Sequence, residues 1–164
     1  MKRITHHTGF FETDSELVSR TLDKWQPTAF TLDERDHEAG LFAWLRQALP
    51  DVPMTTQHGL AKGRADIVIE DSHVIELKLG FTDVLEFDRC IGQLERYRQR
   101  WVNKDRGPVY LVIVGESDPD LRDMLHVWFE EANARFFSWS PFHLVEKLPA
   151  APVELATALE KANI

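Results

Sequence analysis

The sequence predicts one α/β domain in which helices flank a mixed central sheet. Segments with helical spacing of apolar residues alternate with short runs rich in Ile and Val, a pattern typical of this fold class. The chain has 164 residues, an ordinary length for one domain, and no Pro/Gly/Ser-rich linker divides it. Its single cysteine, Cys90, excludes a disulfide framework and a cysteine-built zinc site.

The first part of the chain predicts two helices. A weak helical pattern that ends before Pro27 predicts a peripheral helix within residues 1–30. Thr31 and Glu34 form a capping-box signature, which predicts the start of a second helix. Apolar residues then recur at helical spacing, and Pro50 lies just past the expected end of this helix.

After residue 50 the hydrophobic period changes to that of strands. The expected elements are strands at 54–58, 64–70 and 73–79, a helix at 82–101, a strand at 109–114, a helix at 118–133, strands at 135–139 and 142–148, and a helix at 153–162. The run 109–114 is apolar throughout, as in a strand that is buried on both faces. Residues 31–115 are therefore expected to form a core, and residues 116–164 a C-terminal extension.

Composition limits the partners and the location of the protein. The formal net charge of −8 argues against non-specific coating of nucleic acid and against anionic membranes. No segment approaches the roughly 20 apolar residues of a membrane span, and the first residues lead into no apolar run of a secretion signal. We therefore expect a cytoplasmic protein with no membrane partner. A local basic groove is compatible with this charge, because basic residues gather near Lys62 and again between Arg89 and Arg106.

Charged residues interrupt two of the predicted strands. Successive side chains of a strand alternate between faces, so Glu76 and Lys78 project from one side and Leu77 points into the core. Charged groups in so apolar a segment need a partner, a metal or a substrate to offset their desolvation. Asp66, in the preceding strand, is the nearest acidic residue that can join them across the sheet.

The length of the turn decides whether Asp66 reaches this face. A two-residue turn places Asp66 opposite Leu77, whereas a three-residue connection at 70–72, or a bulge that shifts the register by one residue, places it opposite Glu76, about 4.5–5.5 Å away. We predict the register with Asp66 opposite Glu76, because it also gathers four apolar side chains on the other face. These are Ile67, Ile69, Ile75 and Leu77.

This arrangement predicts a site for a hard divalent cation. Two facing carboxylates repel unless a cation lies between them, and oxygen ligands select Mg²⁺ or Mn²⁺ over zinc. Lys78 beside such a site can orient a water nucleophile or stabilise charge on a phosphate. These are the components of metal-assisted phosphodiester hydrolysis.

Asp66, nine intervening residues and then Glu76-Leu77-Lys78 resemble the motif of the PD-(D/E)xK nuclease superfamily, which includes restriction endonucleases and Holliday-junction resolvases. The resemblance covers roughly residues 33–115, and Ala65 stands where many members have proline. It implies an αβββαβ restriction-endonuclease-like core and Mg²⁺-dependent cleavage of DNA. The ends of the chain lie outside it.

The resemblance also implies roles for individual residues. The metal ligands are the carboxylates of Glu38, Asp66 and Glu76 and the Leu77 carbonyl, and Lys78 assists the attacking water. For the first helix, Glu34 and His37 stay open as alternatives to Glu38. A Gln-Leu-Glu-Arg-Tyr segment begins at Gln93, which is expected to bond near the scissile phosphate or the water. The implied catalytic residues are Asp66, Glu76, Lys78 and Gln93.

A basic helix face is the expected contact with nucleic acid, and it has two interpretations. Arg89, Gln93, Arg96 and Arg100 recur at three and four, so they share one face. They form either a ridge that follows phosphates or a solvated face that pairs with Glu86 and Glu95. The nucleic-acid contacts implied by the first interpretation are Lys62, Arg64, Arg89, Arg96 and Arg100.

The leading hypothesis is a DNA endonuclease or the nuclease module of a defence or repair system. The sequence leaves open RNA as the substrate and a homodimer or larger complex as the assembly. A second hypothesis is a catalytically silent module of the same fold within a larger complex. A third is a small-molecule α/β enzyme whose site lies at the strand ends.

Overall fold

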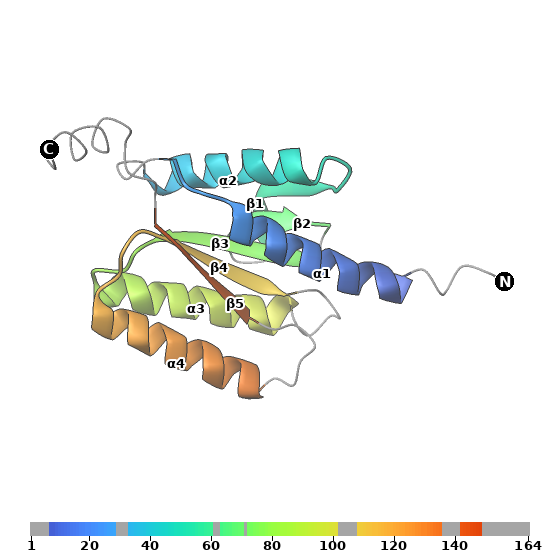
Figure 1. Cartoon of the computed structure of the whole chain (residues 1–164). Helices are drawn as coiled ribbons and strands as arrows, with labels where there is room; N and C mark the ends of the chain where they lie inside the picture. The colour runs from blue at the N-terminus through green and yellow to red at the C-terminus, as the bar shows by residue number, and fades with distance from the viewer. Residues whose placement is uncertain are drawn as a thin grey trace, which may run out of the picture.

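In the computed structural model, the described residues are 7–28, 33–60, 63–70, 72–101, 108–135 and 142–148. Within these ranges the helices and strands follow in an order close to the predicted one (Figure 1). They are α1 (His7–Lys24), α2 (Glu34–Ala48), β1 (Met54–Leu60), β2 (Gly63–Ile69), β3 (His73–Leu79), α3 (Val84–Trp101), β4 (Val109–Val114), α4 (Pro119–Arg135) and β5 (Phe142–Lys147).

The described strands form one mixed sheet in the order β1-β2-β3-β4-β5. The pairs β1–β2 and β2–β3 are antiparallel, whereas β3–β4 and β4–β5 are parallel. Helices α1 and α2 lie on one side of the sheet, and α3 and α4 lie on the other (Figure 1). The predicted α/β class with a mixed sheet flanked by helices is confirmed.

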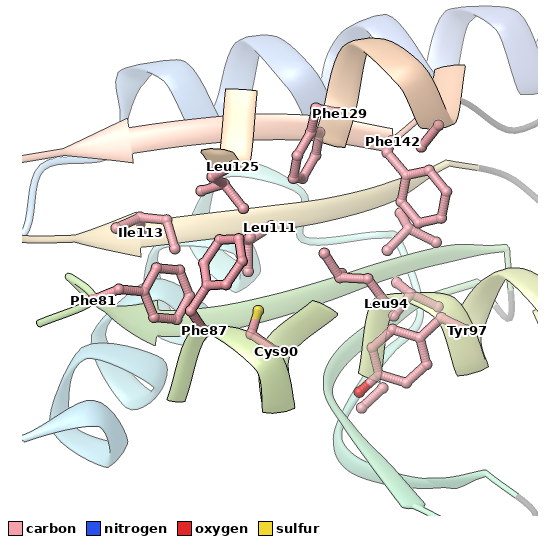
Figure 2. Close-up of a cluster of buried hydrophobic side chains, with 14 of the residues drawn as sticks. Phe81, Phe87, Cys90, Leu94, Tyr97, Leu111, Ile113, Leu125, Phe129 and Phe142 are labelled. Carbon is pink, nitrogen blue, oxygen red and sulfur yellow. The ribbon is translucent and has the colours of Figure 1, made fainter. Parts of the chain in front are cut away.

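Two apolar cores, one on each face of the sheet, hold these layers together. Leu41 and Leu45 of α2 pack with Ile67 and Ile75 in one core. Leu94 of α3 belongs to the other core, a cluster that Figure 2 shows with its labelled aromatic side chains. Every residue of β4 is buried, because this strand has a neighbour on each side and helices on both faces. The prediction of a strand buried on both faces is therefore confirmed.

Strands β2 and β3 pair in the predicted register. Ile69 pairs with His73 and Ile67 with Ile75, so residues 70–72 form the connection and the register places Asp66 across from Glu76. Glu70 adopts a φ of 52°, the left-handed conformation that such a short connection uses. Four apolar residues share the α2 core, as predicted: Ile67, Ile69, Ile75 and Leu77.

The structure corrects where two helices begin. The N-cap of α2 is Asp33, whose side chain accepts the Asp36 amide proton at 2.9 Å, and the helix starts at Glu34; Thr31 lies outside the described residues. Helix α3 begins at Val84 and not at residue 82, because the Asp83 carboxylate accepts the Leu85 amide proton.

The C-terminal extension follows the prediction only in part. The predicted helix at 118–133 is α4, and the strand predicted at 142–148 is β5. The strand predicted at 135–139 is wrong at its first residue, because Arg135 still belongs to α4; residues 136–139 lie outside the described part, as does the helix predicted at 153–162. None of the described helices combines the length and the hydropathy needed to cross a membrane.

Candidate functional site

The candidate site lies where the β2–β3 ladder ends. The last paired residues of the two strands are Ile67 and Ile75. Beyond them, the backbone amide of Leu77 in β3 donates to Asp66 Oδ2 at 2.8 Å. A side-chain carboxylate of β2 thus accepts this hydrogen bond in place of a backbone carbonyl. Asp66 is only 8% exposed. The end of the ladder therefore holds a buried carboxylate in place.

Glu76 is the most deeply buried charged residue of the site, with 0% exposure. Its Oε2 lies 2.6 Å from the Tyr97 hydroxyl, and its Oε1 lies 2.8 Å from Lys78 Nζ. The contact with Lys78 is ionic but poorly directed, so Oε1 accepts no well-formed hydrogen bond within the described part of the chain. Burial raises the pKa of Glu76, although Lys78 and Tyr97 oppose this effect.

Lys78 lies between two carboxylates. Its Nζ is 2.8 Å from Glu76 Oε1 and 3.1 Å from Glu34 Oε1 of α2. Burial by itself lowers the pKa of Lys78, but Glu76 and then Glu34 outweigh burial, and the pKa lies above its ordinary value. The ammonium therefore stays charged at neutral pH.

The pKa of Asp66 reflects first its burial and then the acids around it. Burial, followed by the charge of Glu76, raises the pKa of Asp66 to about 7; Glu38 adds to this, while the Leu77 amide and Lys78 oppose it. One lysine thus faces several carboxylates. A divalent cation is the kind of group that relieves such repulsion.

The three predicted carboxylate ligands do not form a ready cluster. Among the described residues, no group of three or more His, Cys, Asp or Glu side chains is arranged to hold a metal ion. Instead, the side-chain amide of Gln57 lies between two of the acids, with Nε2 2.8 Å from Glu38 Oε1 and 3.4 Å from Asp66 Oδ1. Glu76 has its separate contacts with Lys78 and Tyr97.

Helix α2 contributes two glutamates, because Glu34 and Glu38 are four residues apart and share one face. Glu38 reaches Gln57 near Asp66, and Glu34 reaches Lys78. His37, the third candidate on this helix, is 2% exposed; burial lowers its pKa, although Asp36 and Asp33 oppose this. Both glutamates thus contact site residues, while His37 is buried within the fold.

Helix α3 reaches the site through Tyr97, a residue that was not among the predicted site residues. Gln93 Nε2 donates to the Tyr97 hydroxyl at 2.9 Å. This hydroxyl lies within hydrogen-bonding distance of both Glu76 Oε2 and the Arg64 carbonyl, and its single proton serves one of them at a time. Burial and the charge of Glu76 raise the pKa of Tyr97. Figure 2 shows Tyr97 at the edge of the apolar cluster.

Two cavities flank these residues and carry part of the predicted basic surface. One, of about 480 Å³, is lined by Glu34, Lys78, Arg89 and Gln93 among others. The second, of about 470 Å³, includes Glu38, Gln57 and Arg64 in its lining. Arg64, Arg89 and Arg96 are exposed, whereas Lys62 and the side chain of Arg100 lie outside the described part of the structure.

A larger cavity of about 610 Å³ lies at the carboxyl ends of β4 and β5, and its lining includes none of the candidate site residues. Arg122 and Glu146 in this lining form a two-point ion pair at 2.8 and 3.1 Å. This cavity lies at strand ends, where the third hypothesis places the site of a small-molecule enzyme, and that hypothesis stays a prediction.

Gln57 and Tyr97 contact the site but were not among its predicted residues, and Glu34 was predicted only as an alternative to Glu38. Tyr97 had a signal in the sequence, because it lies four residues after Gln93 on the same helix face. Glu34 stood among the alternatives for the first helix. Gln57 had no signal in the sequence, because its role depends on the pairing of β1 with β2. Comparisons of this chain with protein-family models, curated proteins and solved structures give no match.

Proposed function

We propose that this chain hydrolyses phosphodiester bonds of DNA with Mg²⁺ or Mn²⁺, as a nuclease of the PD-(D/E)xK type with an αβββαβ restriction-endonuclease-like core. One observation carries the proposal: the contact of Lys78 with the fully buried Glu76, in register with Asp66, at the open end of the β2–β3 ladder. A buried acid-rich site with a single lysine is costly to maintain, and the proposed chemistry gives it a use.

The donors present are compatible with a hard cation. They are oxygen atoms, and Glu76 Oε1 is buried without a well-directed hydrogen bond from the described residues. The residues that would hold the ion are Glu38, Asp66 and Glu76, with the Leu77 carbonyl. When bound, such an ion lowers the pKa of a water molecule and polarises the phosphate. The Gln57 amide donates to both Glu38 and Asp66, so binding of an ion by these two carboxylates requires a rearrangement there.

Lys78 acts in this proposal as a fixed positive charge. Its raised pKa keeps the ammonium protonated, so it does not remove a proton from water at neutral pH. It instead stabilises negative charge on the phosphate and orients the attacking water through an N–H group. Glu34 and Glu76 hold the ammonium in place for this role.

Gln93 and Tyr97 complete the arrangement on the α3 side. Tyr97 holds Glu76 in its orientation, and Gln93 in turn bonds to Tyr97. Gln93 also lines the same cavity as Lys78, where a phosphate can contact both. We assign Gln93 to positioning of the scissile phosphate or of the water, and Tyr97 to positioning of Glu76.

DNA is the proposed substrate because exposed arginines lie beside the site despite the acidic total. Arg64 and Arg89 line the two flanking cavities, and Arg96 is exposed on α3. Lys62 and Arg100 are proposed to extend this surface. Contacts of this kind position the phosphate backbone and carry no base preference.

Cleavage assays on plasmid, linear and branched DNA test the proposal. The wild-type chain should cut with Mg²⁺ or Mn²⁺ and not in excess chelator, and Asp66→Ala should lower the rate by at least about 100-fold. The exposed Asp123→Ala on α4 is a matched control that should retain the rate. Full activity of Asp66→Ala would contradict the proposal. Absence of both cleavage and metal binding would favour the catalytically silent module. The Gln57 amide supports this alternative, because it already bonds to two of the proposed metal ligands.

A further inference from the structure

Gln57 has an unusual backbone conformation in the middle of a strand. The pairs Thr56–Ile67 and His58–Ala65 lie on either side of it, so the register of β1 places Gln57 opposite Asp66. Its φ is 50°, in the left-handed region that residues other than glycine enter only at an energetic cost. Such a conformation persists where the surrounding contacts compensate for it.

The side chain of Gln57 provides those contacts. Its Nε2 donates to Glu38 Oε1 at 2.8 Å and to Asp66 Oδ1 at 3.4 Å, and thus joins a carboxylate of α2 to a carboxylate of β2. An amide satisfies carboxylate lone pairs but adds no positive charge. The repulsion between the two acids therefore remains. Gln57 is exposed and lines the cavity beside Glu38, so its side chain has room to leave.

The amide nitrogen and a shared cation would contact the same two carboxylates. Oxygen ligands of Mg²⁺ lie 2.0–2.1 Å from the ion, so two adjacent ligands are about 2.9 Å apart. A cation that joins Glu38 to Asp66 must bind the same two carboxylates to which Gln57 Nε2 now donates. The amide and the cation therefore compete for these oxygens.

We propose that Gln57 is a displaceable positioning residue, which holds Glu38 toward Asp66 in the metal-free protein and competes with the divalent cation for these two carboxylates. This inference rests on the proposed function. The amide contacts stabilise the metal-free protein and are lost when the metal binds. The free energy of metal binding is therefore less favourable by the free energy of these contacts. Removal of the amide should thus destabilise the metal-free protein and strengthen metal binding.

Gln57→Met tests this, because methionine has a similar length and no hydrogen-bond donor. Titration calorimetry with Mg²⁺ and with Mn²⁺ should show a Kd lower than that of the wild type by about 10- to 150-fold, the equivalent of one hydrogen bond to a charged group. Thermal unfolding in excess chelator should show a lower Tm for the variant. A residue with only a structural role would lower the Tm without strengthening metal binding.

A second variant at Gln57 keeps the test valid if Gln57→Met fails to fold, and a third variant serves as the control. Gln57→Asn suits the left-handed backbone but is one methylene too short to keep both contacts, so it too should bind metal more tightly. Gln47→Met makes the same chemical change at an exposed position of α2 and should leave the Kd unchanged.

The outcomes separate this inference from the proposed function. Tighter binding by both Gln57 variants, with or without detectable binding by the wild type, supports it. Wild-type binding with equal or weaker binding by the two variants overturns the competition alone. No binding by any of the proteins overturns the proposed function and the inference together.

Discussion

The Tyr97 hydroxyl lies 2.6 Å from Glu76 Oε2, so helix α3 contacts the most buried carboxylate of the sheet directly. Gln93 follows behind it, bonded to the same hydroxyl at 2.9 Å. The orientation of Glu76 therefore depends on a residue that is twenty-one positions away in the sequence. This contact links the packing of α3 to the chemistry proposed for β3.

Tyr97→Phe should weaken both stability and activity. Removal of the hydroxyl leaves a buried carboxylate oxygen without its donor, and hydrogen bonds to charged groups contribute about 1.5–3 kcal/mol. We expect the free energy of unfolding to fall by that amount in urea denaturation, together with a lower cleavage rate. Tyr110→Phe removes a hydroxyl from a buried tyrosine that bonds to Ser19, and it should retain cleavage. Wild-type activity of Tyr97→Phe would remove Tyr97 from the site.

Replacement of Lys78 should cost stability as well as activity. Lys78→Met leaves Glu76 buried without its cation, and loss of one partner of a buried pair costs about 3 kcal/mol. The double variant Glu76→Gln/Lys78→Met removes the uncompensated charge and should regain most of this stability. Cleavage should stay absent in both variants. Chemical denaturation and DNA cleavage measured side by side distinguish the two effects, and cleavage by either variant would refute the proposed role of Lys78.

The metal-free protein should become less stable as the pH rises from 5 to 8. The pKa of Asp66 is about 7 in the folded chain, above the value of about 4 for an unfolded chain, so the folded state retains a proton that the unfolded state releases. The free energy of unfolding should fall by roughly 2–3 kcal/mol over this interval. Mg²⁺ should reverse part of the decrease at pH 8, because it favours the ionised carboxylates.

Asp66→Asn is the control for this pH dependence. Asparagine does not titrate, so the variant should lose the part of the decrease that Asp66 carries. The contributions of the histidines and of Glu76, whose pKa is also raised by burial, stay. Burial lowers the pKa values of His37 and His143, so their contribution to the free energy of unfolding falls as the pH falls. This dependence has the opposite sign to that of Asp66. Identical slopes for the wild type and Asp66→Asn would show that Asp66 does not carry the effect.

Arg89→Ala should separate the two interpretations of the basic face of α3. If this side chain follows phosphates, DNA binding weakens for all sequences alike, and the slope of log K against log salt falls by about 1. If Arg89 belongs to a solvated face, neither quantity changes. Arg20→Ala, at a position of α1 that lines neither flanking cavity, is the matched control. Fluorescence anisotropy with labelled DNA at several salt concentrations measures both quantities.

Much of the fold was predictable because its signals are local. The apolar run of β4, the helical spacing in α2 and the alternation in β3 each depend on neighbouring residues only. The register of β2 and β3 was also predictable, because it places Ile67, Ile69, Ile75 and Leu77 together in the core that faces α2. The helix starts were less predictable, since Asp33 and Asp83 compete with nearby residues as caps.

The sequence by itself determined that Asp66, Glu76 and Lys78 share one end of the sheet, since strand period and turn length are properties of a short segment. Only the tertiary structure decided which groups surround them. Gln57 reaches Asp66 through the pairing of β1, Glu34 reaches Lys78 through the packing of α2, and Tyr97 reaches Glu76 through the packing of α3. These contacts join residues that are far apart in the chain, and their geometry depends on how whole elements pack against the sheet.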